Sequence, residues 1–294
     1  MGTTEHTNRS GRRSWKRRTT AIAAVVGLSL AAASCSALPV TAFTRIPAPA
    51  RTADVSGVEW YASPAANDRE VRLALVRADG TGPHPVVLIL PGSDGLHDDY
   101  IRLAREYAAQ GFDAATGCWF AFPEASDTIR TDCANGPTFD GVSEGSVASV
   151  DALVDAALRA TGAPADQLAI IGYSRGGGAA LLRAARTGAT NPIVDLSGMV
   201  TGQVGGWPSP YRTADVNVVA SAAAIHAPTL ALHGVADSIV VPTQTLLLAT
   251  ALQNAGTDVS VHWYPGSNHD LLNHSDTRAD VIARSSTWIR QQLG

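Results

Sequence analysis

Ser174 stands in a sequence that could make it a nucleophile. The motif is Gly172-Tyr-Ser-Arg-Gly176, with glycine two positions before and two positions after the serine. An apolar run, 168–171, precedes it and small helix-forming residues follow, which predicts a strand, a sharp turn and a helix. A serine at such a turn is strained, and its near neighbours must be almost free of side chains. We therefore predict a nucleophile elbow with Ser174 at a helix N-terminus, where anionic intermediates are favoured.

The same spacing occurs a second time, in Gly141-Val-Ser143-Glu-Gly145. Roughly one chain in six of this length and composition would contain such a motif by chance, so the spacing alone identifies neither serine. No strand-like run precedes Ser143, and an amphipathic helix pattern follows it. We therefore interpret Ser143 as a helix N-cap and Ser174 as the nucleophile.

An aspartate and a histidine follow two later predicted strands. Asp237 comes after the apolar run 229–233, and His269 comes after the run 259–264. Loops at the carboxyl ends of parallel strands converge on one edge of a sheet. His269 could then accept the proton of Ser174 while Asp237 orients the imidazole. The chain order Ser, Asp, His is that of the α/β-hydrolase fold.

Other polar residues offer alternatives to these assignments. Asp195 also ends a predicted strand and is the second candidate for the acid, although the spacing between Asp237 and His269 is the more typical one. His233 and His262 are interpreted as hydrogen-bonding residues of the framework, and His274 lies near the last helix. No pair of histidines has metal-ligand spacing on one helix, so we predict no metal site and no cofactor.

Three motifs together resemble the dienelactone-hydrolase-like branch of the α/β-hydrolase superfamily. They are Gly-Tyr-Ser-Arg-Gly-Gly from 172, His-Gly-x-x-Asp from 233 with Val-Pro at 241, and Tyr-Pro-Gly-x-x-His from 264. The resemblance covers roughly 71–293 and implies the fold and hydrolysis through Ser174, Asp237 and His269. Dienelactone hydrolase itself has cysteine where this chain has Ser174, so the resemblance implies a serine esterase. The Pro-Gly-Ser-Asp-Gly loop from 91 is similar to that of acyl-thioester hydrolases, so thioester cleavage stays open.

The same resemblance implies that two backbone N–H groups bind the oxyanion. They are those of Arg175 and Ser93, with Asp94 as second choice for the latter. The Arg175 side chain could bind a substrate carboxylate or pair with a nearby acid. The residues predicted to flank the substrate are Asp94, Trp119, Trp207 and Tyr211.

The first 56 residues differ in composition from the rest. A basic segment, 9–18, precedes an apolar run, 21–33, which is too short to span a bilayer and predicts a signal peptide over 1–36. It could be an ordinary or a twin-arginine signal. Cys35 follows Ala-Ala-Ser and resembles a lipoprotein acylation site, the alternative being cleavage after Ala33 or Ala37. Residues 37–56 are rich in Ala, Pro and Thr and predict a linker, and 57–294 predict one domain.

Residues 37–294 hold 16 basic and 25 acidic side chains, a formal net charge of −9, and contain no lysine. This charge argues against binding to nucleic acid or to an anionic membrane surface. Without Cys35, Cys118 and Cys133 form an even pair that could join as a disulfide in an oxidising compartment.

Alternating strand and helix patterns predict a doubly wound, mostly parallel sheet, with opening antiparallel strands near 58–62 and 71–77. The sequence therefore predicts an exported or lipid-anchored serine hydrolase that acts on a small-molecule ester. The alternatives are a thioester hydrolase or peptidase with the same triad, and a catalytically silent binding protein of the cell envelope. The oligomeric state is left open.

Overall fold

The computed structural model describes residues 42–49, 55–121, 129, 133–137, 142–201, 203–204, 207–208 and 217–294, all within one compact unit, Leu38–Gly294. The predicted signal peptide, Cys35 and Tyr211 lie outside the described residues.

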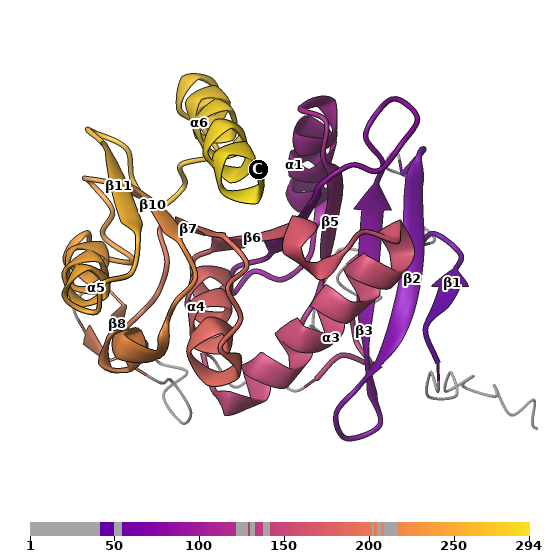
Figure 1. Ribbon diagram of the computed structural model, residues 1–294, viewed down its shortest axis with the longest axis horizontal. Coiled ribbons are helices and arrows are strands. Elements are labelled where there is room, and N and C mark those ends of the chain that lie inside the picture. The colour runs from indigo at the N-terminus through magenta and orange to yellow at the C-terminus, as the bar shows by residue number, and fades with distance from the viewer. Residues whose placement is uncertain are drawn as a thin grey trace, which may run out of the picture. The chain divides into compact units, whose positions relative to one another are not determined.

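A nine-stranded sheet runs through this unit in the order β1-β2-β3-β5-β4-β6-β7-β10-β11 (Figure 1). The first four strands in this order pair antiparallel, and the pairs from β5 through β11 are parallel. This arrangement confirms the predicted mostly parallel sheet. Two further strands, β8 (Gln203–Val204) and β9 (Trp207–Pro208), form a separate ribbon. The sheet strands are β1 (Thr44–Ile46), β2 (Val58–Ala65), β3 (Arg69–Val76), β4 (Val86–Leu90), β5 (Asp113–Cys118), β6 (Leu168–Tyr173), β7 (Ile193–Leu196), β10 (Thr229–Gly234) and β11 (Val259–Tyr264).

Helices cover both faces of the sheet. Helices α1 (Asp98–Ala109) and α6 (Ser275–Leu293) pack on one face, while α3 (Glu144–Thr161), α4 (Arg175–Thr187) and α5 (Thr243–Asn254) pack on the other (Figure 1). The short 3₁₀ helices are η1 (Ala165–Gln167) and η2 (Val219–Ala224). Such two-sided coverage is what makes the central strands apolar throughout.

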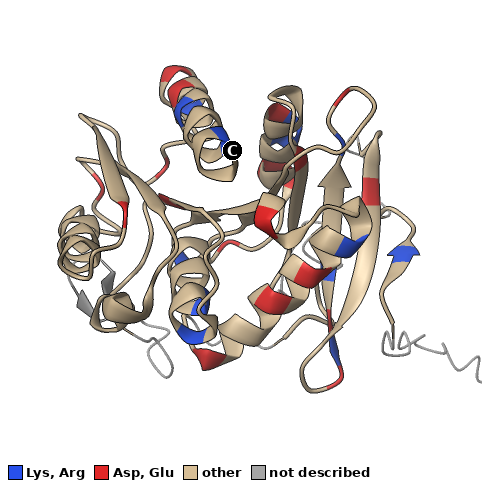
Figure 2. Ribbon diagram, viewed as in Figure 1, with Lys and Arg blue, Asp and Glu red and all other residues tan. Residues whose placement is uncertain are grey.

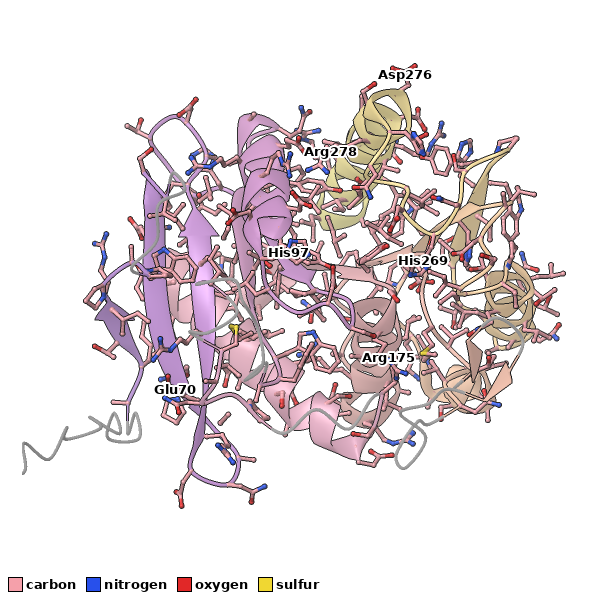
Figure 3. The ribbon with its side chains drawn as sticks, turned by 180° about the vertical axis from the view of Figure 1, so that it is seen from behind. Glu70, His97, Arg175, His269, Asp276 and Arg278 are labelled. Carbon is pink, nitrogen blue, oxygen red and sulfur yellow. A yellow bond between two sulfur atoms is a disulfide. The ribbon has the colours of Figure 1, made fainter. Side chains whose placement is uncertain are left out.

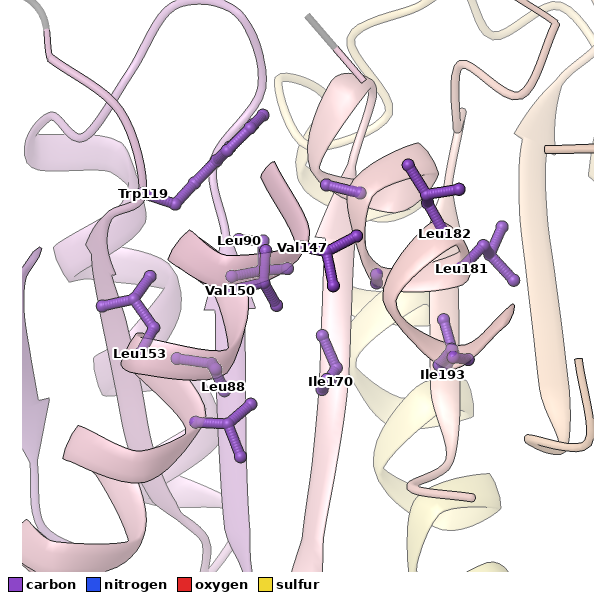
Figure 4. Packing of buried hydrophobic residues seen from close by; sticks show 14 of the residues in the cluster. Leu88, Leu90, Trp119, Val147, Val150, Leu153, Ile170, Leu181, Leu182 and Ile193 are labelled. Carbon is purple, nitrogen blue, oxygen red and sulfur yellow. The ribbon is translucent and has the colours of Figure 1, made fainter. Parts of the chain in front are cut away.

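Strand β4 shows how one strand serves two cores. Val86, Leu88 and Leu90 belong to the core under α3 and α4, and Val87 and Ile89 belong to the core under α1 and α6. All five are fully buried, because successive side chains of a strand point to opposite faces. Figure 4 shows Leu88 and Leu90 packed with side chains of α3 such as Val150 and Leu153.

Part of the predicted linker is a strand of the sheet. Thr44–Ile46 forms β1 and pairs antiparallel with β2, from Ala62 to Trp60. Phe43 stacks on Tyr61 with ring centroids 5.2 Å apart, which attaches this segment to the domain. The domain thus begins earlier than position 57, because three residues are enough to extend an existing edge even in an Ala/Pro-rich segment.

The charged residues are distributed over many elements. Figure 2 shows basic residues on β1, β3, α1, α3, α4 and α6, with acidic residues on α1, α3 and α6 as well. No helix in the part of the chain that the structure describes combines the length and the apolar character needed to cross a membrane.

Candidate active site

Ser174 lies where β6 ends and α4 begins. Its backbone has φ 53° and ψ −116°, the strained region that a nucleophile elbow requires. A Cβ on Gly172 would lie 2.5 Å from the Gly176 carbonyl carbon, and one on Gly176 would overlap the Leu90 carbonyl oxygen. Both positions therefore exclude any larger residue. The predicted strand, turn and helix are confirmed.

The structure brings Ser174, His269 and Asp237 into one line of contacts. His269 Nε2 lies 3.1 Å from Ser174 Oγ, and His269 Nδ1 lies 2.7 Å from Asp237 Oδ2. All three residues are buried. Because the carboxylate only accepts, Nδ1 of His269 carries the proton and Nε2 is left to accept from the serine hydroxyl. In Figure 3, His269 and Arg175 mark the region where the loop after β11 meets the start of α4.

Asp237 is held by donors on both of its oxygens. Oδ1 accepts from the N–H groups of Ile239 and Val240, each at 2.9 Å, and Oδ2 accepts from His269 and from His233 Nε2 at 3.1 Å. Burial acts to raise the pKa of Asp237. The hydrogen bonds from the two histidines outweigh burial and hold that pKa well below its usual value. Asp237 is therefore ionised when it faces His269.

Asp195, the alternative acid, ends the neighbouring strand but lies away from His269. A Cβ on Gly177 or on Gly198 would overlap Asp195 Oδ1, so the carboxyl is enclosed by these two backbones under the elbow. Burial raises the pKa of Asp195 to about 7, and smaller effects of the nearby His233 ring and of the Gly198 N–H oppose this rise. A carboxyl of this kind is a poor anchor for an imidazolium, and the geometry selects Asp237.

The loop after β4 lies against the nucleophile. A Cβ on Gly92 would lie 3.3 Å from Ser174 Cβ, and Ser93 is the next residue of this loop. Arg175 is the first residue of α4, and its N–H therefore points out of the helix N-terminus beside Ser174. The two predicted oxyanion donors thus come from the two segments that meet at Ser174.

This loop is held by side chains of α1 and its N-cap. Gly92 N–H donates to the Tyr100 hydroxyl at 2.8 Å, and that hydroxyl donates to Asp94 Oδ1 at 2.9 Å. His97 lies 2.7 Å from Asp94 Oδ2 through Nε2, while its Nδ1 accepts from Asp99 N–H at 3.3 Å. Asp94, predicted to contact substrate, is therefore already bound on both oxygens and braces the loop, with its side chain 43% exposed.

Tyr173 supports the histidine from the other side. Its hydroxyl donates to the His269 carbonyl oxygen at 3.3 Å and lies 3.1 Å from Asp270 Oδ1, and the Tyr173 and His269 rings are 5.2 Å apart. Tyr173, Asp270 and Asp94 also line a cavity of about 90 Å³ beside the triad. The residue before the nucleophile thus fixes the loop that carries the base.

The structure corrects the interpretation of one aromatic residue. Trp119 is 2% exposed, packs against Phe120 and donates from Nε1 to the Pro91 carbonyl oxygen at 3.0 Å. It therefore supports the oxyanion loop from within the core and does not line an open pocket. Trp207 lies in β9, but its side chain and the whole of Tyr211 lie outside the described residues.

Four other predicted residues have clear positions. The Arg175 side chain is 2% exposed, so its guanidinium is enclosed in the protein and is not displayed at the surface. Cys118 and Cys133 are joined by a disulfide, with Cα atoms 5.6 Å apart. Ser143 is the N-cap of α3, as predicted.

Three residues that hold the active-site loops in place were not predicted from the sequence. Tyr100, His97 and Thr245, the partner of His233, carry no motif signal, because each acts through side-chain contacts that form only when its helix packs against the neighbouring loop or strand. Within the described ranges, no group of three or more His, Cys, Asp or Glu side chains is arranged to hold a metal ion.

Comparison with known proteins identifies the family to which this chain belongs. Residues 145–294 match the model of the prolyl oligopeptidase family, Peptidase_S9. No curated protein matches the chain.

Solved structures show the same fold at low identity. A protein assigned as a dienelactone hydrolase from Klebsiella pneumoniae is 21% identical with a TM-score of 0.63, over 80% of this chain and 99% of that one. Est1E from Butyrivibrio proteoclasticus is 15% identical with a TM-score of 0.59, over 81% and 99%. A puromycin-hydrolyzing peptidase of Mycobacterium tuberculosis is 18% identical with a TM-score of 0.60, over 82% of this chain. This chain spans only 40% of that peptidase and 35% of two dipeptidyl peptidase structures.

The elbow, the sheet order and the family match agree with the resemblance that the motifs predicted. The chain belongs to the prolyl oligopeptidase family and is a serine hydrolase of the α/β-hydrolase type.

Proposed function

We propose that this protein cleaves carboxylic esters through an acyl-enzyme intermediate on Ser174. The observation that carries the proposal is the line of contacts from Ser174 through His269 to Asp237, at 3.1 and 2.7 Å. A buried, ionised carboxylate at the end of this line stabilises the imidazolium that forms when the serine loses its proton.

In this mechanism Ser174 Oγ attacks the ester carbonyl carbon while its proton moves to His269 Nε2. The oxyanion of the tetrahedral intermediate accepts hydrogen bonds from the N–H groups of Ser93 and Arg175. When the intermediate collapses, His269 gives the proton to the leaving alcohol and the acyl group stays on Ser174. Water then attacks the acyl-enzyme, with His269 as base, and releases the carboxylic acid.

Two observations favour an ester over a peptide. The chain matches the Klebsiella dienelactone hydrolase and Est1E over 99% of their lengths, so the domain corresponds to nearly all of each. The peptidases are matched over 35–40% of theirs, and the rest of those chains has no counterpart in the match. The match to the Peptidase_S9 family favours a second candidate, peptide-bond hydrolysis with the same residues.

The test uses residues 38–294 or the full chain with p-nitrophenyl esters of increasing acyl length, an acyl thioester and aminoacyl p-nitroanilides. Ser174→Ala is the control, and a fluorophosphonate probe reports whether Ser174 reacts. Ester turnover and labelling, both lost in the variant, would support the proposal. Turnover of the anilides alone would favour the peptidase. A folded protein with neither turnover nor labelling would leave the catalytically silent binding protein.

We propose further that the protein is exported, with Cys35 as a lipid attachment site. Support comes from the basic and apolar segments before Cys35 and from the Cys118–Cys133 disulfide, which suits an oxidising compartment. Cell fractionation of the full chain and of Cys35→Ser tests this. The wild type is expected in the membrane fraction and the variant outside it; equal distribution of the two would contradict lipidation.

A further inference from the structure

A second histidine contacts the acid of the triad. His233 is the fifth residue of β10 and lies four positions before Asp237, and its side chain is fully buried. Nε2 lies 3.1 Å from Asp237 Oδ2 and 2.8 Å from the Val240 carbonyl oxygen, while Nδ1 lies 2.6 Å from Thr245 Oγ1 of α5. The contacts to Ser174 therefore continue beyond Asp237 for two more residues.

The neighbours of His233 decide which nitrogen carries its proton. The Val240 carbonyl and the Asp237 carboxylate are both acceptors, so Nε2 must be the donor to them. Nδ1 of the neutral ring is then left to accept from the Thr245 hydroxyl, which can rotate to donate. The two acceptors at Nε2 thus select the tautomer in which His233 donates to the triad acid, and the Thr245 hydroxyl of α5 supports it by donating to Nδ1.

The Nε2–H group of His233 donates to the same carboxylate oxygen of Asp237 that accepts from His269. Oδ2 of Asp237 accepts from both imidazoles, whereas Oδ1 accepts the two backbone N–H groups of the 237–240 turn. The carboxylate is therefore fixed in rotation about its Cβ–Cγ bond, with Oδ2 between the two rings. Without His233, the turn alone would hold one oxygen and leave Oδ2 with a single partner.

We infer that His233, oriented by Thr245, is a positioning residue of this active site: its Nε2–H group fixes Asp237 and shares its negative charge. The inference rests on the proposed serine-hydrolase mechanism. His233 does not touch the reacting atoms. It acts through Asp237 on the basicity and orientation of His269.

The expected consequence of losing this donor is a change in the pH dependence of catalysis. A carboxylate with one donor fewer attracts the imidazolium more strongly and so favours the charged form of the ring. Because only neutral His269 can accept the serine proton, the acid limb of kcat/KM then moves to higher pH. Three other groups lie near His233: Asp195 of β7, Thr245 of α5 and the Trp263 ring of β11, 6.1 Å away. Substitution of His233 alone leaves these three side chains unchanged.

The test compares His233→Leu, which removes the donor, with His233→Gln, whose amide can place an N–H near the position of Nε2. We expect His233→Leu to lower kcat on the ester substrate by roughly 10- to 100-fold with little change in KM, and to shift the acid limb upward. His233→Gln should recover most of the rate and restore the acid limb. A fall in rate that is equal at every pH, with an unshifted limb, would show a purely structural role and overturn the inference.

Two further measurements test the role of His233 without a substrate, or without the His233→Leu variant if that variant does not fold. Histidine ring NMR of the wild type reports the tautomer of His233, and a proton on Nδ1 would contradict the assignment. The same spectra titrate His269 in each folded variant; an unchanged midpoint in His233→Leu would also contradict it. If His233→Leu does not fold, Thr245→Val against Thr245→Ser makes the comparison: the valine variant alone should lower the rate, by a few fold.

A failure of the proposed function would look different. In that case the wild type would neither turn over any ester, thioester or anilide nor react with the fluorophosphonate, whatever the NMR titrations show. Failure of the present inference would instead leave an active wild type, with the acid limb and the His269 titration midpoint unshifted in His233→Leu.

Discussion

Two serines of this chain share one motif, and only one of them is built as a nucleophile. Ser143 and Ser174 both have glycine two positions before and after, and both are helix N-caps. Ser143 has an extended backbone, φ −142° and ψ 174°, and its N–H donates to Ser146 Oγ at 3.2 Å. Ser174 has φ 53° and faces His269. The motif alone specifies a helix start, and its surroundings specify the chemistry.

The surroundings differ in what comes before the serine. Ser174 follows a buried strand that pairs with two neighbours, so the chain must reverse within one residue to enter α4. That reversal forces the positive φ and pushes the Gly172 and Gly176 backbones together. The chain before Ser143 is not an apolar run, so α3 can begin from extended backbone at no conformational cost.

The largest predicted difference is between alanine variants of the two serines. Ser174→Ala should lower ester hydrolysis by on the order of 10⁴- to 10⁶-fold, because it removes the nucleophile. Ser143→Ala should leave activity unchanged and alter the free energy of unfolding by less than about 1 kcal/mol. Steady-state rates and thermal unfolding of both variants measure this. Retained turnover in Ser174→Ala would disprove the assignment.

The same comparison can be made for the two aspartates that end neighbouring strands. Asp237→Asn should lower kcat by roughly 10⁴-fold, because an amide can donate to His269 and favour the wrong tautomer. Asp195→Asn should lower kcat by less than about tenfold, since Asp195 makes no contact with His269. Measuring kcat for both variants at one pH decides between them. A larger loss in Asp195→Asn would reverse the assignment of the acid.

Asp195 should instead appear in the pH dependence of stability. Its pKa is about 7 in the folded protein against 3.8 in a free side chain, so the folded state holds the proton more tightly. The folded state is therefore favoured below about pH 4 and loses this advantage as the pH rises to about 7, by roughly 4 kcal/mol in total. Asp195→Asn should lack this loss. Urea unfolding of both proteins from pH 4 to 8 tests it, and parallel curves would show that Asp195 is already ionised in the fold.

The sequence predicted the parts of the site that depend on local pattern. Apolar runs placed β6, β10 and β11, and the rule that parallel strands end on one edge brought Ser174, Asp237 and His269 together. The period of the apolar residues also placed α3 and α6. These features depend on residues near one another in the chain or on the chirality of the crossovers.

Individual side-chain contacts between a loop and its neighbours could not be predicted in this way. Trp119 is buried with its indole N–H on the Pro91 carbonyl oxygen, and Asp94 braces its loop because Tyr100 and His97 lie within hydrogen-bond distance of its two oxygens. Strand β1 was missed because edge pairing takes three residues of any β-compatible type. These interactions form only when the elements pack together, and no periodic pattern in the sequence predicts them.

The smallest predicted effect concerns the loop that faces Ser174. Tyr100→Phe removes the acceptor of the Gly92 N–H and the donor to Asp94 Oδ1, which should loosen the segment that carries the Ser93 N–H. We expect kcat to fall by a few fold to about tenfold with KM little changed, because a displaced donor weakens the oxyanion contact more than substrate binding. Tyr107→Phe is the matched control, since Tyr107 is buried on the same helix and its hydroxyl lies 2.7 Å from Ser285 Oγ, on α6. Both variants should lose about 1 kcal/mol of stability, but only Tyr100→Phe should lose rate. Equal rates in the two would mean that the loop holds its oxyanion geometry without Tyr100.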